Sequence, residues 1–150
     1  MSADQEVQYI YRPTEPESLP SDVEFVSSAE FLTDEPACKM LWELIDTQFR
    51  TRGKFLAIWR CVSFLCVHRD ADGTLDGFLL ISSPVNWQID YVVVRPDSRG
   101  QGVASKLVQA ANGHAHRLNV PYVMLTSKPS LRPLYEACGF RVVQAADVLV

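Results

Sequence analysis

The sequence predicts a single α/β domain with a mixed, mostly antiparallel central sheet flanked by helices. The chain has 150 residues, of which 47% are hydrophobic, and this is enough for one packed core. A predicted hairpin in the middle of the chain makes neighbouring strands antiparallel. Later a strand, a helix and a second strand follow one another, which is typical of a crossover connection.

The first 22 residues are predicted to form a tail or an edge strand, and residues 23–150 the folded domain. Residues 7–11 could pair with a sheet. Three prolines interrupt any longer element in this region, and they are Pro13, Pro16 and Pro20. A short strand is expected at residues 23–26, where the alternation of apolar side chains is weak.

A helix and a hairpin are expected next. Asp34 and Pro36 form a helix-start signal, and the apolar stripe after them predicts a helix that ends near Gly53. Residues 55–68 are ambiguous, because their apolar run fits a helix at its start and a strand at its end. A turn signal then joins this segment to a strand over residues 74–82.

The second half of the chain contains the clearest elements. Residues 87–94 are rich in β-branched and aromatic side chains and predict a strand, and a glycine-rich loop follows it. Residues 103–118 predict an amphipathic helix, and residues 122–126 a short buried strand. A short helix over residues 129–138 and a last strand over residues 140–150 complete the expected order.

The loop between the strand and the helix predicts a phosphate site. Gly100 and Gly102 let several backbone N–H groups approach one anion, and the helix N-terminus adds partial positive charge. A Walker A loop would end in Gly-Lys-Ser/Thr, whereas this loop continues with Val103. A Rossmann fingerprint would need Gly or Ala in place of Ser105 and an acidic residue near Asn119. Neither motif therefore matches.

The segment resembles the coenzyme A loop of the GNAT N-acetyltransferase superfamily. The family pattern Arg/Gln-x-x-Gly-x-Gly/Ala is matched by Arg99, Gly102 and Ala104. The family's preceding Val-x-Pro is matched at residues 94–96, and its later Leu-Tyr-x-x-x-Gly-Phe segment at residues 134–140. The resemblance implies a GNAT-like sheet with a splayed strand pair that holds acetyl-CoA.

The resemblance also implies how acetyl-CoA, the co-substrate, would bind. Pantetheine would lie between the splayed strands and hydrogen-bond to the backbone like an added strand. The backbone groups concerned are those of Val92, Val93 and Val94. The pyrophosphate would contact N–H groups of the loop and the first helical turn. These belong to Arg99, Gly100, Gln101, Gly102, Val103 and Ala104.

The implied mechanism is direct attack by an amine in a ternary complex. A backbone N–H near Val94 would stabilise the oxyanion, and Tyr135 would protonate the departing coenzyme A thiolate. A lysine-type acceptor amine has a pKa of ~10.4 and must lose a proton before it attacks. From its residue type alone, Tyr135 could equally be a core aromatic on a short helix.

Two positions depart from the family pattern. Gln88 stands where many members have Glu, and glutamine cannot act as a general base. Asp90 lies two residues on, on the same strand face, and could take the proton through water or pair with a neighbouring charge. Lys128 stands where many members have Asn, and it could reach a coenzyme phosphate or face solvent.

Composition narrows the expected partners. The net charge is −4 and the pI is about 5.3. Nucleic-acid binders usually carry a basic patch and have a high pI, so this acidic chain does not favour that class of protein. We expect a small-molecule or peptide amine acceptor, no nucleic acid and no membrane, and we leave a homodimer open. No apolar run reaches the ~18 residues of a membrane span, and no signal peptide opens the chain, so a cytoplasmic protein is expected.

No metal site is expected from the cysteines and histidines. The four cysteines show no CxxC pair and are expected to be reduced thiols. His68 ends a predicted strand and is expected to be exposed. His114 and His116 lie two apart on a predicted helix, so they cannot share a metal.

Three function hypotheses stay open at this point. The first is an N-acetyltransferase with an unidentified acceptor. The second is a non-catalytic acyl-CoA-binding regulatory module, which Gln88 favours and Tyr135 disfavours. The third is a structural or regulatory partner domain with a decayed pocket, which the intact glycine loop disfavours.

Overall fold

The structure is a computed structural model that describes residues 6–49, 52–83 and 85–144. Within these residues one sheet has the strand order β2-β3-β4-β5-β6-β1-β7. Its strands are β1 (Val7–Tyr11), β2 (Val23–Ser27), β3 (Val62–Arg69), β4 (Leu75–Ser82), β5 (Trp87–Val94), β6 (Val123–Ser127) and β7 (Arg141–Val142). The helices are α1 (Ser28–Phe31), α2 (Glu35–Gln48), α3 (Arg52–Trp59), α4 (Val103–Arg117) and α5 (Arg132–Ala137), with 3-10 turns η1 (Pro96–Ser98) and η2 (Pro129–Leu131).

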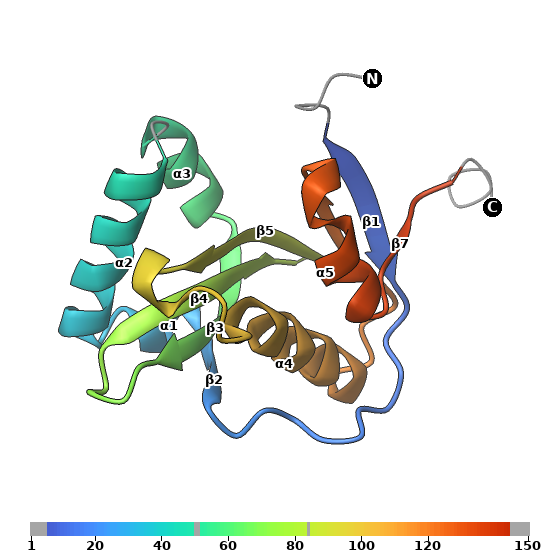
Figure 1. Ribbon diagram of the computed structural model, residues 1–150, viewed down its shortest axis with the longest axis horizontal. Coiled ribbons are helices and arrows are strands. Elements are labelled where there is room, and N and C mark those ends of the chain that lie inside the picture. Colours follow the sequence, from blue (N-terminus) through green and yellow to red (C-terminus); the bar gives the residue numbers. More distant parts are fainter. Residues whose placement is uncertain (1–5, 50–51, 84, 145–150) are drawn as a thin grey trace.

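The sheet is mixed and mostly antiparallel, as the sequence predicted. Neighbouring strands run antiparallel except β5 and β6, which are parallel and are joined by the crossover through α4. Helix α4 lies on one face of the sheet, and α2 and α3 lie on the other side of the molecule (Figure 1). The two faces therefore bury two separate hydrophobic clusters, since successive side chains of a strand point to opposite faces.

Helix α4 confirms the prediction for residues 103–118 and packs very closely on the sheet. A Cβ atom at Gly77 of β4 would lie 2.8 Å from Cγ1 of Val103, so glycine is what allows the helix to approach this strand. Leu107 and Val108 are fully buried in the next turn. The chain leaves the helix at Asn119, which adopts a φ of 57°.

The N-terminal strand is the main difference from the prediction. We expected a tail or an edge strand, but β1 lies between β6 and β7 in the interior of the sheet. All five of its residues are paired with β6. It is also closely packed, because a Cβ atom at Gly139 would lie 2.7 Å from the ring of Tyr11. A five-residue segment carries no signal for its partner strand, so its position could not be read from the chain.

Three smaller differences concern element boundaries. Helix α2 ends before Gly53, because Phe49 adopts an extended conformation and packs edge-on against Tyr91 at 5.3 Å between ring centroids. Short helix α1 was not expected. The ambiguous residues 55–68 divide as the two halves of their pattern suggested, into the end of α3 and most of β3. The last strand is shorter than predicted, and residues 145–150 lie outside the described part of the chain.

His68 is buried, contrary to the expectation of an exposed side chain. Its Nδ1 lies 2.6 Å from Oδ1 of Asp76, which is 2% exposed, and its Nε2 lies 3.1 Å from Oδ2 of Asp22. Lys106 of α4 binds the same Asp22 oxygen at 2.6 Å. The network links the segment before β2 to β3, β4 and α4, so it has a structural role.

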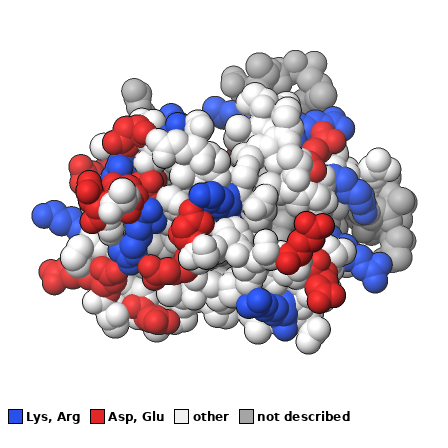
Figure 2. Space-filling view, turned by 60° about the horizontal axis from the view of Figure 1, so that its bottom comes forward, with Lys and Arg blue, Asp and Glu red and all other residues white. Residues whose placement is uncertain are grey.

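Charged side chains of both signs are interspersed on the face shown in Figure 2. Acidic side chains gather at the end of the molecule that carries α2 (Figure 2), where Glu35 and Glu43 are exposed. Among the described helices, none is both long and apolar enough to span a membrane.

Candidate active site

Strands β5 and β6 pair only over a short distance and then diverge. Their parallel register covers Trp87, Gln88 and Ile89 of β5, and the last pair is Ile89 with Leu125. From Tyr91 to Val94, β5 pairs with β4 on one side but has no β6 partner on the other. The strand edge is therefore open there, which confirms the predicted splay.

A glycine loop follows the open end of β5. Gly100 has a φ of 79° and Gly102 a φ of 76°, a backbone conformation that other residues rarely adopt. Gly102 is the N-cap of α4 and provides no side-chain hydrogen bond to the helix. The N–H groups of the first turn of α4 have no partners within the helix, so they can bind an external acceptor.

One cleft of about 530 Å³ combines the open strand edge with this loop. We call it the β5–α4 cleft. Its lining residues are Gln48, Val92, Val93, Val94, Ser98, Arg99, Gly100, Gly102, Val103, Ala104, Ser105, Leu131, Leu134 and Tyr135. Most of the residues predicted to bind the coenzyme thus lie around one space, although they come from a strand, a loop and a helix.

Gln48 is a cleft residue that the sequence analysis missed. It ends α2, and its Oε1 accepts a hydrogen bond from Nη2 of Arg99 at 2.8 Å. Its amide also approaches the carbonyl oxygen of Val94 at 3.5 Å. Gln48 therefore connects α2 to both the open strand and the loop. Only the helical stripe that contains it could have drawn attention to this residue.

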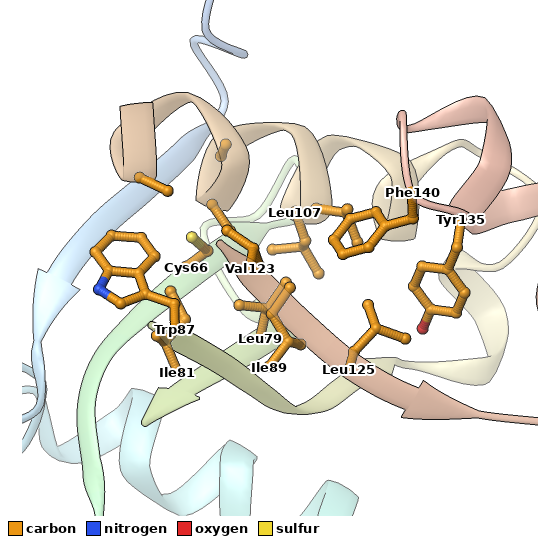
Figure 3. Close-up of a cluster of buried hydrophobic side chains, with 14 of the residues drawn as sticks. Cys66, Leu79, Ile81, Trp87, Ile89, Leu107, Val123, Leu125, Tyr135 and Phe140 are labelled. Atoms are coloured by element: carbon orange, nitrogen blue, oxygen red, sulfur yellow. The ribbon is translucent and has the colours of Figure 1, made fainter. Parts of the chain in front are cut away.

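Tyr135 points from α5 toward β6 and lies beside Leu125 in the close-up of the core (Figure 3). It is 5% exposed and lies at the wall of the cleft. Burial raises the pKa of Tyr135, and a hydrogen bond with the Ser127 side chain partly offsets this. At neutral pH the phenol therefore keeps its proton, as a proton donor must.

Asp90 occupies the point where the two strands part. The β4–β5 register skips it, since Leu80 pairs with Tyr91 and Ile81 with Ile89, so Asp90 is the extra residue of a β-bulge. Ser82 hydrogen-bonds to the carboxylate through its side chain and its backbone. The other oxygen, Oδ2, is buried and has no hydrogen-bond partner in the described part of the chain. Burial raises the pKa of Asp90 above that of an ordinary aspartate.

Not all the predicted site residues line the cleft. The side chain of Gln101 is exposed on the loop, and Lys128 is exposed just before η2; neither contributes to the wall of the cleft. Asp90 is not a wall residue either, and the residues of β5 that line the cleft are Val92, Val93 and Val94. Gln88 lies within the paired part of β5.

The cysteines and possible metal ligands stand apart from this site. Cys66 is buried, which raises its thiol pKa to about 12, and burial likewise raises the pKa of Cys138. All four cysteines are free thiols. In the part of the chain that the structure describes, no three His, Cys, Asp or Glu side chains are grouped to hold a metal ion.

A family model described as an acetyltransferase (GNAT) domain matches residues 61–148. This match covers more than half of the chain and includes β5, the glycine loop, α4 and α5. The chain therefore belongs to the GNAT acetyltransferase family.

Solved structures share the fold. A GCN5-related N-acetyltransferase from Sphaerobacter thermophilus aligns with a TM-score of 0.65 and 22% identity, over 92% of this chain and 48% of that one. A GNAT-family protein from Novosphingobium aromaticivorans aligns with a TM-score of 0.64 and 21% identity, over 93% of this chain and 60% of that one. An IAA acetyltransferase from Bacillus cereus aligns with a TM-score of 0.64 and 17% identity, over 81% of this chain and 79% of that one. The chain thus spans only 48% and 60% of the length of the first two.

Proposed function

We propose that the chain is an N-acetyltransferase that moves the acetyl group of acetyl-CoA to a primary amine by direct attack in a ternary complex. The observation that carries the proposal is the β5–α4 cleft, which brings an open strand edge, a glycine loop and a buried tyrosine around one space. Family membership supports the acetyl donor, whereas the amine acceptor is part of our proposal.

The residues of the cleft fit acetyl-CoA. Among the described residues, the edge of β5 from Val92 to Val94 has no strand partner on the β6 side, and an extended pantetheine chain can bind there like a strand. Space is open beside Gly100 and Gly102, since a Cβ atom at either position would meet nothing within 4 Å. The loop N–H groups and the Arg99 guanidinium can therefore reach a pyrophosphate.

Two groups are suited to the proton transfers. Tyr135 holds a proton at the cleft wall and would supply it to the sulfur of coenzyme A as the thioester breaks. Asp90 would accept the proton of the amine through water, with its free Oδ2 as the acceptor atom. Gln88 cannot take this role because its side chain is an amide. Asp90 is the carboxylate of β5 that can.

The test is an acceptor panel, with the release of free coenzyme A thiol as the measurement. The panel covers aminoglycosides, polyamines, amino acids and peptides with a free N-terminus. We expect turnover with at least one primary amine and none with the matched N-methylated tertiary amine. If acetyl-CoA binds but no acceptor in any class is acetylated, the proposal is wrong.

The second candidate is an acyl-CoA-binding module without catalysis, and Gln88 favours it. In that case the loop and the strand edge would still bind the coenzyme, and Tyr135→Phe would change nothing measurable. Thermal unfolding separates both candidates from a domain with a decayed pocket. A ligand at about 100 times its Kd adds about 2.7 kcal/mol to the free energy of unfolding.

A further inference from the structure

The N-terminal strand lies next to the candidate active site. Tyr9 of β1 is paired with Leu125 of β6, and Leu125 is paired with Ile89 of β5. These three residues form one row across the sheet at the last β5–β6 pair. Tyr9 therefore lies at the level where the cleft begins to open, although it precedes residues 61–148 of the family match.

Tyr9 contacts the candidate proton donor directly. Its ring centroid lies 5.4 Å from that of Tyr135, with the planes tilted by 42°. Phe140 lies 6.0 Å from Tyr135 in an edge-on arrangement. Helix α5 has six residues, and so short a helix does not hold its position without tertiary contacts. The position of the Tyr135 ring therefore depends on Tyr9 and Phe140.

The hydroxyl group of Tyr9 is unusual. Tyr9 is fully buried, and its hydroxyl oxygen has no hydrogen-bond partner among the described residues. Phenylalanine would fill the same volume without burying an unpaired polar group, which is unfavourable in a protein interior. Burial also raises the pKa of Tyr9, so the hydroxyl keeps its proton and can donate it to a hydrogen bond.

We infer that Tyr9 is a positioning residue for Tyr135, and that its hydroxyl pairs with the Tyr135 phenol when the cleft is loaded. The inference rests on the proposed function in so far as Tyr135 is the proton donor. It makes the N-terminal strand part of the active site and not merely of the sheet.

The kinetic test uses Tyr9→Phe, which removes the hydroxyl and keeps the ring. We expect kcat to fall about 5- to 20-fold while the KM for acetyl-CoA stays within about twofold. In a Tyr135→Phe background the same substitution should cost nothing more, because Tyr9 acts through Tyr135. An unchanged kcat, or an equal loss in both backgrounds, would overturn the inference.

Tyr11→Phe is the matched control. Tyr11 lies on the same strand and packs on Phe140 at 5.4 Å, but its hydroxyl is paired with Thr14 at 3.1 Å, away from Tyr135. It should leave kcat unchanged. Thermal unfolding should show that Tyr9→Phe is at least as stable as the wild type, since an unpaired hydroxyl is removed.

A second readout does not depend on turnover. In spectra of protein labelled with [ζ-¹³C]tyrosine, Tyr9→Phe should shift the Tyr135 signal in the presence of acetyl-CoA, whereas Tyr11→Phe should not. A Tyr135 signal that is identical in Tyr9→Phe and wild type would overturn the inference. If no acceptor is ever acetylated, the proposed function is wrong, and the labelled spectra still decide whether the two hydroxyls interact.

Discussion

Gln48 accepts a hydrogen bond from Arg99 across the β5–α4 cleft, with 2.8 Å between Oε1 and Nη2. The contact joins the end of α2 to the loop that begins α4. It holds the Arg99 guanidinium beside the cleft, next to the glycine loop. The anion site that we propose would therefore depend on both halves of the chain, not on the glycine motif alone.

Arg99→Ala should weaken the binding of acetyl-CoA about 10- to 100-fold, because a charge-assisted hydrogen bond to phosphate is worth about 1.5–3 kcal/mol. Gln48→Leu should weaken it less, since the guanidinium remains but loses its partner. Calorimetry measures both affinities. Gln101→Ala, on the same loop with an exposed side chain, is the control and should bind normally. Equal affinities for Arg99→Ala and Gln101→Ala would show that Arg99 does not contribute to acetyl-CoA binding.

Gly102→Asp should abolish binding of acetyl-CoA in a protein that still folds. The carboxylate would enter the anion site and repel the pyrophosphate. Gly73→Asp is a matched control, because Gly73 has a φ of 81°, similar open space and a place in the β3–β4 turn. Both substitutions carry the same backbone strain, so a difference in calorimetric affinity reports on the cleft. Undiminished affinity of Gly102→Asp would refute the loop assignment.

Asp90→Asn should slow turnover at least ~10-fold with little change in acetyl-CoA affinity, if Asp90 accepts the proton of the amine. Stability should respond to pH as well. Because burial raises the pKa of Asp90, the folded chain binds this proton more tightly than the unfolded chain. The protonated Asp90 carboxyl therefore contributes stability that is fully present below the ordinary aspartate pKa. This contribution is lost as pH rises through the raised pKa of Asp90 in the folded chain.

Denaturant unfolding between about pH 4 and pH 8 measures whether the contribution of Asp90 to stability falls as pH rises. The stability of Asp90→Asn relative to the wild type should increase with pH. Ser82→Ala, which removes a hydrogen bond to the ionised carboxylate, should move the loss of stability to still higher pH. A difference between Asp90→Asn and wild type that stays constant with pH would contradict this account of Asp90.

Asp76→Asn should destabilise the fold without weakening acetyl-CoA binding. It replaces the carboxylate that lies 2.6 Å from buried His68, and a hydrogen bond to a charged group contributes about 1.5–3 kcal/mol. Asp97→Asn is the control, since the Asp97–Arg95 pair is exposed and such pairs contribute about 0–1 kcal/mol. The measurement is the free energy of unfolding, and equal losses in the two variants would refute a structural role for the His68 network.

The local features of the site were predictable from the sequence, because each has a short-range signal. The strand before the loop, the glycines at positive φ and the amphipathic pattern of α4 are all local. Gln48 could not be predicted as a cleft residue, because its contact with Arg99 joins distant parts of the chain. The bulge at Asp90 has no glycine to mark it, and it changes how the residues of β5 are presented.

The position of β1 could not be predicted for a related reason. Its five residues indicate a strand but not a partner, and pairing with β6 depends on where the crossover through α4 places that strand. Tyr9 was therefore overlooked, although it contacts the one tyrosine that the motif had indicated. His68 was misplaced because its two carboxylate partners, Asp76 and Asp22, are brought together only by the fold.

The most direct test of the account is the kcat of Tyr135→Phe with a working acceptor. The substitution removes one oxygen and its hydrogen bond with Ser127, so stability should fall by only about 1 kcal/mol and acetyl-CoA affinity should hardly change. If Tyr135 protonates the departing thiolate, kcat should fall about 10²-fold, with the loss confined to kcat. A variant that turns over at the wild-type rate would show that Tyr135 is a packing residue and would contradict the proposed mechanism.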